Sequence, residues 1–524
     1  MTKRRSIIAL TLAAVAVVFW LAGAKNFSNA KQAPSNTSSP SKLTTERETS
    51  GLDPTLSRDI EEAIAQSDSS HARWGVFVVS MKDGRILVSN NGDRLFTPAS
   101  NMKIYTTAVA LDLVGADYRW RTSVYALKQP DANGVIDGDL ILYGRGAPDL
   151  DSKKKESLPA LVDQLYVRGV RRVRGNIVGD ESYFRSEMHG DGWQWNDLQW
   201  YYGAEPSALS IDENSVEVTM GPANKISASA SVVVNPNDSY FALANSATTG
   251  ERDAPTTIGI NRGLSNNDVH VWGEFPIGGR AFSAFLSVHN PALHAATIFK
   301  QLLKARGIQV DGDVRGRDFR VAESEKLDPR NAVELAFIES ASLAEVVRKT
   351  NKESNNLYAE LILRTLGKER GATAPDSDPR KNASRGDDVA GTAVVTKWLN
   401  DHGIGTSALA IHDGSGLSRL DLVTPESTAR LLAIAAQSRW SKTFQDSLPI
   451  AGRDGTLEGR LNNLAGRIIA KTGSLTYDHS LSGYVTTTSG EILAFSIICN
   501  DATGGTHPIR AIDEIGSRIA GYIP

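Results

Sequence analysis

The sequence has only one cysteine in 524 residues, Cys499, which lies in the apolar run 493–499. A single thiol excludes an intramolecular disulfide and a cysteine-rich metal cluster, and its apolar neighbours predict a buried structural thiol. The His-Glu-x-x-His pattern of zinc peptidases is also missing, and His189, His402 and His412 have no metal-ligand spacing. We therefore expect no metal site and no cofactor.

An excess of charge of one sign is lacking as well. The chain carries 57 Lys and Arg against 60 Asp and Glu, which gives a formal net charge of -3. This balance offers no polybasic surface for nucleic acid, so a small or neutral partner fits better. The chain is 41% hydrophobic and 22% charged, and it is too long for one core, so we expect two or more globular domains.

The amino terminus has the arrangement of an export signal. Basic residues at positions 3–5 precede an uncharged apolar run, 7–24, which ends in small residues. Residues 1–24 are therefore predicted to be a signal peptide or, if uncleaved, an N-terminal anchor and the only contact with a membrane. Residues 25–51, rich in Ser, Thr, Asn, Pro and Lys, predict a disordered linker. We expect an exported, periplasmic or otherwise extracytoplasmic protein.

Two hairpin patterns lie near opposite ends of the chain. Residues 74–79 and 86–88 flank one tight turn, and residues 481–487 and 492–499 flank another. Together they predict one antiparallel sheet that contains both ends of the chain. Helical stretches that stop before a glycine lie between the hairpins, at residues 102–114, 357–366 and 394–399.

The middle of the chain, residues 117–327, has a different texture. Short β-rich runs alternate with Gly and Pro, and helical stretches at 158–168 and 293–305 interrupt them. We interpret this region as a β-rich accessory insertion that forms two domains. The parent is then an α/β catalytic domain formed by residues 52–116 and 328–524.

Three short motifs follow one another in a fixed order: Ser100-Asn101-Met102-Lys103, Ser354-Asn355-Asn356 and Lys471-Thr472-Gly473. Each alone is a weak signal, but the set is typical of penicillin-binding proteins and class A β-lactamases. What decides between chemistry and chance is whether each motif lies on the element that its chemistry requires.

The first motif is predicted to open a helix. Thr97 can cap this helix and Pro98 suits its first position, which leaves the backbone N–H of Ser100 free to hold an oxyanion. Lys103 follows one turn later, within reach of the Ser100 hydroxyl. It can accept that proton once burial or a neighbouring cation, for which Lys471 is a candidate, lowers its pKa.

The other two motifs are predicted to lie on a loop and a strand. Ser354 and Asn356 fall between two helical stretches, in a loop that can aim a hydroxyl and an amide into a cleft. Lys471 and Thr472 end an apolar run, so they lie on a strand, where a cation and a hydroxyl suit a terminal carboxylate. The N–H of Ser474 is the natural second donor of an oxyanion hole.

Beyond these motifs, the chain resembles the low-molecular-mass class C penicillin-binding proteins, the penicillin-binding protein 4 type of D-alanyl-D-alanine carboxypeptidase/endopeptidase. The resemblance covers about residues 52–524 and includes the stretches 354–360 and 413–419. The long interval between Ser100 and Ser354 matches this family, whereas class A β-lactamases have a much shorter one. The implied fold is a penicillin-binding/serine β-lactamase-like transpeptidase domain, an antiparallel sheet flanked by helices, with a large β-rich insertion that forms two smaller domains.

The resemblance also implies an activity. Ser100 would be the acylated nucleophile and Lys103 its base, and the middle residue of the second motif, Asn355, where many relatives carry Asp, would point away from them. The substrates would be peptidoglycan stem peptides, cut at D-Ala-D-Ala bonds or at D-Ala-diamino-acid cross-links, and β-lactam antibiotics would be covalent inhibitors. The resemblance further implies that Ser354 and Lys471 relay protons. It also implies that Asn356, Thr472 and Ser474 contact the substrate.

Three alternatives stay open at this point. A β-lactamase would need a water-activating residue that the sequence does not identify. A non-catalytic wall-binding protein would keep the fold, but the intact motifs disfavour it. Finally, the aromatic stretch 193–202 is either a sugar-stacking face or a packed core, and we favour the core.

Overall fold

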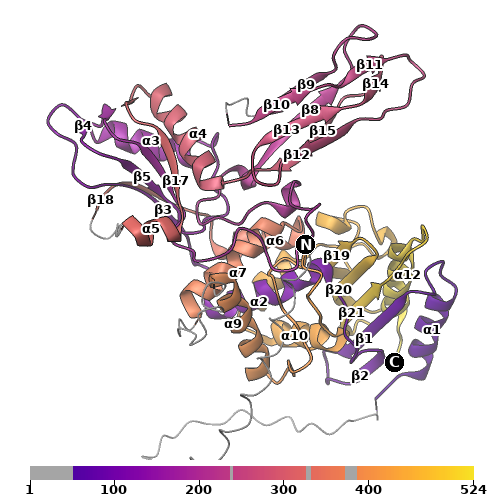
Figure 1. Ribbon diagram of the computed structural model, residues 1–524. Helices are drawn as coiled ribbons and strands as arrows, with labels where there is room; N and C mark the ends of the chain where they lie inside the picture. Colours follow the sequence, from indigo (N-terminus) through magenta and orange to yellow (C-terminus); the bar gives the residue numbers. More distant parts are fainter. Residues whose placement is uncertain (1–50, 236–239, 326–331, 372–385) are drawn as a thin grey trace, which may run out of the picture. The chain divides into compact units, whose positions relative to one another are not determined.

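The computed structural model describes residues 51–235, 240–325, 332–371 and 386–524 (Figure 1). The predicted signal peptide or anchor, residues 1–24, and the predicted linker up to residue 50 lie outside these ranges. Within them, no helix has the length and apolar character needed to cross a bilayer.

A five-stranded antiparallel sheet joins the two ends of the described chain. Its strand order is β19-β20-β21-β1-β2, and β1 pairs with β21 over its whole length, with Trp74 opposite Cys499. The sheet predicted from the two hairpin patterns is thereby confirmed. Its strands are β1 (Arg73–Ser80), β2 (Ile86–Asn90), β19 (Ile468–Leu475), β20 (Asp478–Thr486) and β21 (Ile492–Asn500).

Both faces of this sheet are buried, because side chains that alternate along each strand enter two different cores. Val76 and Val78 pack in a cluster with α1 (Pro54–Ala65) and α12 (Pro508–Gly521). Phe77 lies on the other face, in a cluster with the helices between β2 and β19. Cys499 is in the first cluster and fully buried, which confirms the predicted structural thiol.

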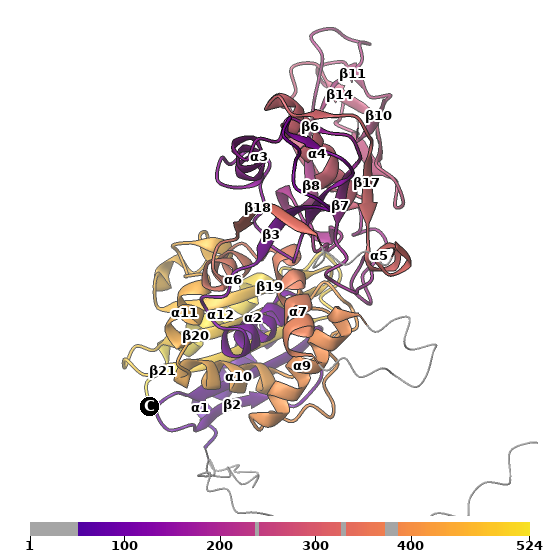
Figure 2. The same ribbon diagram turned by 90° about the vertical axis from the view of Figure 1, so that its left-hand side faces the viewer.

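One of the helices that cover the Phe77 face of the sheet, α2, runs through the interior of the domain. Ten consecutive residues of α2, from Met102 to Leu111, are buried, so this helix has no solvent-facing stripe. The predicted helices at 102–114, 357–366 and 394–399 are confirmed, the last two longer than expected (Figure 2). The helices of this group are α2 (Met102–Leu113), α6 (Leu343–Lys352), α7 (Asn356–Arg370), α9 (Asp387–Asp401), α10 (Pro425–Gln437) and α11 (Ser441–Ser447).

Between α2 and α6 the chain builds a second five-stranded sheet, ordered β17-β7-β5-β3-β18, with a core that α3 and α4 share. The elements of this part are β3 (Arg121–Ala126), β4 (Val135–Ile136), β5 (Leu140–Tyr143), α3 (Leu158–Val167), β6 (Arg172–Val173), β7 (Ile177–Asp180), α4 (Pro291–Ala305), β16 (Gln309–Val310), β17 (Val314–Arg317), α5 (Phe319–Glu325) and β18 (Val333–Glu339). Because β18 pairs with β3, this sheet extends past residue 327, where the predicted insertion ends.

Smaller sheets with a core of their own lie between β7 and α4, and both predicted helical stretches of the middle region are present as α3 and α4. The strands of the smaller sheets are β8 (Ser215–Gly221), β9 (Ser231–Asn235), β10 (Ala242–Asn245), β11 (Thr248–Gly250), β12 (Gly259–Arg262), β13 (Asp268–Trp272), β14 (Glu274–Pro276) and β15 (Phe282–Ser287). The division of residues 117–327 into two domains stays a prediction.

The aromatic stretch 193–202 packs against a core only in part, so our preferred interpretation is wrong for two of its rings. Trp195 is 72% exposed and Tyr201 is 55% exposed, whereas Trp200 packs against the core that includes Leu286. Up to the short η2 (Tyr201–Gly203) the stretch is a series of turns. Turns have no fixed inward face, so neighbouring rings point in different directions.

Truncating two tryptophans distinguishes these environments. Trp195→Ala should change the free energy of unfolding by no more than about 0.5 kcal/mol, because the ring is solvated. Trp120→Ala should cost about 3–5 kcal/mol, because that ring is buried and its Nε1 donates to Thr365 Oγ1 at 2.8 Å. Urea unfolding of both variants measures the difference, and similar losses would contradict the exposed placement of Trp195.

Candidate active site

Ser100 lies in η1 (Ala99–Asn101), a 3₁₀ turn that runs directly into α2. The predicted cap by Thr97 is wrong. The backbone N–H of Thr97 donates to Asn500 Oδ1 at 2.8 Å and its carbonyl accepts from Asn500 Nδ2 at 3.1 Å, so this residue is tied to β21. Pro98 takes the cap position without a side-chain hydrogen bond. Ser100 still precedes Lys103 by one turn, as predicted.

Lys103 is fully buried and surrounded by three oxygen atoms. Its Nζ lies 3.0 Å from Ser100 Oγ, 2.6 Å from Asn356 Oδ1 and 2.7 Å from the carbonyl oxygen of Ser415. Burial lowers the pKa of Lys103 to about 7, against the opposing effect of nearby carboxylates, Asp413 first among them. The neutral amine and the ammonium are therefore both accessible near neutral pH.

Lys471, on β19, is also fully buried, and its Nζ donates to Ser354 Oγ at 2.9 Å and to the carbonyl of Thr472 at 2.8 Å. Burial, and next the charge of Lys103, hold the pKa of Lys471 well below its ordinary value. The sequence suggested Lys471 as the cation that lowers the pKa of Lys103, and in the structure burial is the main cause of the lowered pKa of both lysines.

Ser354 lies between α6 and α7, as predicted, and its backbone is in the left-handed region at φ 60°. Asn355 caps α7, accepting from the N–H of Tyr358 at 3.1 Å, and its amide donates to Glu213 at 2.8 Å. Asn356 is the first residue of α7, and its amide donates to the carbonyl of Tyr202 at 2.8 Å. Asn355 and Asn356 thus contact different groups.

The third motif passes directly beside Ser100. A Cβ atom built on Gly473 would lie 3.0 Å from the backbone nitrogen of Ser100 and 2.8 Å from the carbonyl oxygen of Pro98. Only glycine allows this approach. Thr472 Oγ1 donates to Thr456 Oγ1 at 2.7 Å, and Ser474, which is exposed, has its Oγ 3.2 Å from His479 Nδ1.

A cavity of about 500 Å³ brings most of the predicted residues together. Lys103, Lys471 and Thr472 are not among its lining residues. Part of the cavity wall was not predicted, although its residues lie within the aromatic stretch, the region around it and the stretch 413–419. The predicted residues that line it are Ser100, Ser354, Asn356 and Ser474, and the missed ones include Asp197, Tyr201, Tyr202, Glu213, Leu417 and Arg419.

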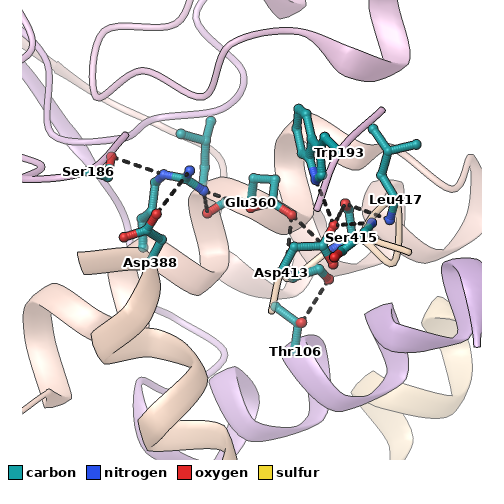
Figure 3. Close-up of polar contacts among 12 residues, drawn as sticks. Thr106, Ser186, Trp193, Glu360, Asp388, Asp413, Ser415 and Leu417 are labelled. Carbon is teal, nitrogen blue, oxygen red and sulfur yellow. Dashed lines mark hydrogen bonds and ion pairs between the residues drawn. The ribbon is translucent and has the colours of Figure 1, made fainter. Parts of the chain in front are cut away.

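A network of buried carboxylates supports the loop that carries Ser415 (Figure 3). Asp413 accepts from the backbone N–H groups of Ser415, Gly416 and Ser418 at 3.2, 2.7 and 2.9 Å. Glu360 accepts from the N–H of Ser415 at 3.0 Å. These bonds fix the turn whose carbonyl faces Lys103.

The chain is similar in sequence to one family of known peptidases. The sequence signature of the D-Ala-D-Ala carboxypeptidase 3 (S13) family matches residues 56–519. The chain belongs to this family. A D-alanyl-D-alanine carboxypeptidase of an Actinomadura species is 35% identical over 480 residues, which make up 89% of this chain and 85% of that protein. An S13 relationship over nearly the whole described chain follows.

The S13 fold is confirmed by a solved structure. The crystal structure of penicillin binding protein 4 from Haemophilus influenzae matches with a TM-score of 0.76 and 26% identity, over 89% of this chain and 99% of that one. The predicted resemblance and fold class are correct. The S13 protein described here is a serine-type D-Ala-D-Ala carboxypeptidase homologue that acts on the cell wall, outside the cytoplasm.

Gly473→Ala tests the close approach of β19 to η1. The added methyl group would crowd the backbone of Ser100, so we expect D-Ala release from a stem-peptide substrate to slow by about a hundredfold, the scale of a misplacement near 1 Å. Gly405→Ala is the matched control, because a Cβ there meets no atom within 4 Å. Full activity of Gly473→Ala would contradict the geometry.

Proposed function

We propose that this protein hydrolyses the D-Ala-D-Ala bond of peptidoglycan stem peptides through an acyl-enzyme on Ser100. The observation that carries the proposal is the fully buried Nζ of Lys103, 3.0 Å from Ser100 Oγ, with the pKa of this amine lowered to about 7. An amine that is partly neutral near pH 7 and within hydrogen-bond distance is suited to act as a general base.

Acylation begins when neutral Lys103 accepts the hydroxyl proton of Ser100 and Oγ attacks the carbonyl carbon of the scissile bond. The resulting ammonium can donate to Asn356 Oδ1 and to the carbonyl of Ser415, at 2.6 and 2.7 Å. The carboxylate of Asp413 also favours this charged form. The site therefore stabilises the base after it has taken the proton.

Negative charge then develops on the former carbonyl oxygen. We assign its stabilisation to the backbone N–H groups of two residues that line the same cavity, Ser100 and Ser474. Gly473 lies close to the backbone nitrogen of Ser100, so β19 and η1 are adjacent at this point. This proximity supports the assignment of the two N–H groups to one oxyanion hole. A substrate lying along β19 would have its carbonyl between the two donors.

Collapse of the tetrahedral intermediate breaks the C–N bond, and the leaving D-Ala amine needs a proton. Ser354 Oγ can supply it and recover a proton from Lys471, whose Nζ lies 2.9 Å away. Asn356 would hold a substrate amide, and Thr472 and Ser474 the terminal carboxylate. Water then attacks the Ser100 ester and passes a proton through Ser354 to the amine of Lys471. Ser100 Oγ leaves and takes back its proton from the Lys103 ammonium, so both lysines return to their starting states.

A β-lactam ring carries a strained amide that can follow the same acylation path. H. influenzae penicillin binding protein 4, which shares this fold, has been crystallised in complex with a β-lactam. We infer that β-lactams acylate Ser100 here as well, and that endopeptidase cleavage of cross-links uses the same acyl-enzyme. We also propose that residues 1–24 export the protein to the periplasm or tether it to the membrane.

The accessory region also takes part in this proposal. Tyr202 and Glu213, which precede β8, line the cavity and contact Asn356 and Asn355. We propose that the accessory region extends from residue 117 to Glu339, because β18 completes its larger sheet. Its function in this scheme is to form the outer wall of the substrate cavity.

A labelled penicillin should form one covalent adduct, on the peptide that contains Ser100. Intact-mass measurement and peptide mapping locate it. Ser100→Ala should give no adduct, because the nucleophile is gone, whereas Ser70→Ala, at an exposed position, should react like the wild type. An adduct on another residue would assign the nucleophile elsewhere.

The rate of penicillin acylation should rise with pH and level off above about 7, because the reactive form of Lys103 is the neutral amine. Lys103→Arg should remove this rise and slow acylation by at least about a hundredfold, since a guanidinium does not lose its proton in this range. Stopped-flow acylation between pH 5 and about 9 is the measurement. Wild-type rates in Lys103→Arg would exclude this lysine as the base.

A further inference from the structure

The indole of Trp193 reaches the carboxylate network behind the active site. Its Nε1 donates to Asp413 Oδ2 at 2.9 Å, across 220 residues of sequence (Figure 3). Trp193 belongs to the stretch between β7 and η2, which is part of the predicted accessory region, and it carries none of the three motifs. The accessory region therefore touches the support of the active site directly.

This contact is one of several that join the same two segments. Ser418 Oγ donates to the carbonyl of Asp191 at 2.6 Å, and the N–H of Arg419 donates to the carbonyl of Gly192 at 3.3 Å. Asp191 Oδ2 lies 2.8 Å from His412 Nδ1. Trp193 is thus held against the 412–419 loop by its own neighbours.

Asp413 connects this stretch to the reacting groups. It accepts from the backbone of the turn that carries Ser415, and the carbonyl of Ser415 accepts from Lys103 Nζ at 2.7 Å. Only two hydrogen-bonded residues, Asp413 and Ser415, separate the indole of Trp193 from the amine that faces Ser100.

We propose that Trp193 is a positioning residue for acylation: its indole N–H orients Asp413 and partly neutralises its charge, and so adjusts the proton affinity of Lys103. The inference rests on the proposed function of Lys103 as the base. It implies that the accessory region affects the chemical step as well as access to the cavity.

The charged groups around Lys103 give the sign of the effect. Asp413, Glu360 and Asp421 are the carboxylates that favour its ammonium form, and Lys471 is a second buried amine close to it. Glu360 forms an ion pair with Arg364 at 2.7 Å, and this partner compensates the negative charge of Glu360. The N–H of Trp193 does the same for Asp413.

Asp413 keeps other hydrogen-bond donors when that N–H is removed. Three backbone N–H groups and the hydroxyl of Ser415 still donate to it, at 2.7 to 3.2 Å. Burial, and next the charge of Asp413, raise the pKa of its neighbour Asp421 well above the ordinary value. Removing the indole N–H therefore makes the field at Lys103 more negative and its ammonium more stable.

Trp193→Phe removes the donor and keeps an aromatic ring. The midpoint of the pH dependence of penicillin acylation should rise by about half to one pH unit, which slows acylation about three- to tenfold at pH 6. Near pH 9 the rate should approach that of the wild type, because Lys103 is then neutral in both proteins. Trp195→Phe, in the same stretch but exposed, is the matched control and should leave the midpoint unchanged.

Each other outcome has a definite meaning. A uniform loss of rate at every pH would make Trp193 merely structural, and an unchanged or lowered midpoint would overturn the proposal. If wild-type acylation shows the Lys103-dependent rise and Trp193→Phe does not shift it, the proposed function survives and only this inference fails.

A second measurement observes the hydrogen bond in the wild-type protein itself. The indole N–H of Trp193, observed by NMR in ¹⁵N-tryptophan-labelled protein, should exchange with solvent much more slowly than that of Trp195. Single Trp→Phe variants at the two positions assign the signals. Equal exchange rates would show that the hydrogen bond to Asp413 is not maintained in solution, and this too would overturn the proposal.

Discussion

The active site depends on one costly feature, an amine buried without a formal counter-ion in contact with it. Lys103 is fully buried, and the groups that touch its Nζ are a hydroxyl, an amide oxygen and a backbone carbonyl. Burying an ammonium is unfavourable, so its pKa falls. The carboxylates stand one layer further out, where they limit the fall without removing the reactivity.

This arrangement explains why the surroundings of the site are so extensively hydrogen-bonded. Ser415 can present its carbonyl to Lys103 only while Asp413 and Glu360 hold the turn around it. Asp413 and Glu360 in turn are buried and need donors of their own, which Trp193 and Arg364 supply. The site is therefore a layered structure, and each layer satisfies the polar groups of the one inside it.

Much of the fold and of the candidate site could be predicted from local sequence. The two terminal hairpins gave the central sheet, because alternating apolar residues and tight turns are local signals. The spacing of Ser100 and Lys103 placed them one turn apart. Local patterns were insufficient at two places. The backbone N–H and carbonyl of Thr97 hydrogen-bond to the side chain of Asn500, which is far away in the sequence. Trp195 lies in a series of turns, which have no regular periodicity, and is exposed to solvent.

The sequence by itself determined the types of chemical group, their order and the elements that carry them, since motifs and periodicity lie within short segments. Only the tertiary structure decided which of these groups are buried, and hence that the pKa of Lys103 falls to about 7. It also brought Trp193 and Glu213 to the site. Burial and long-range hydrogen bonds depend on how segments far apart in the chain pack together, and no local pattern records that packing.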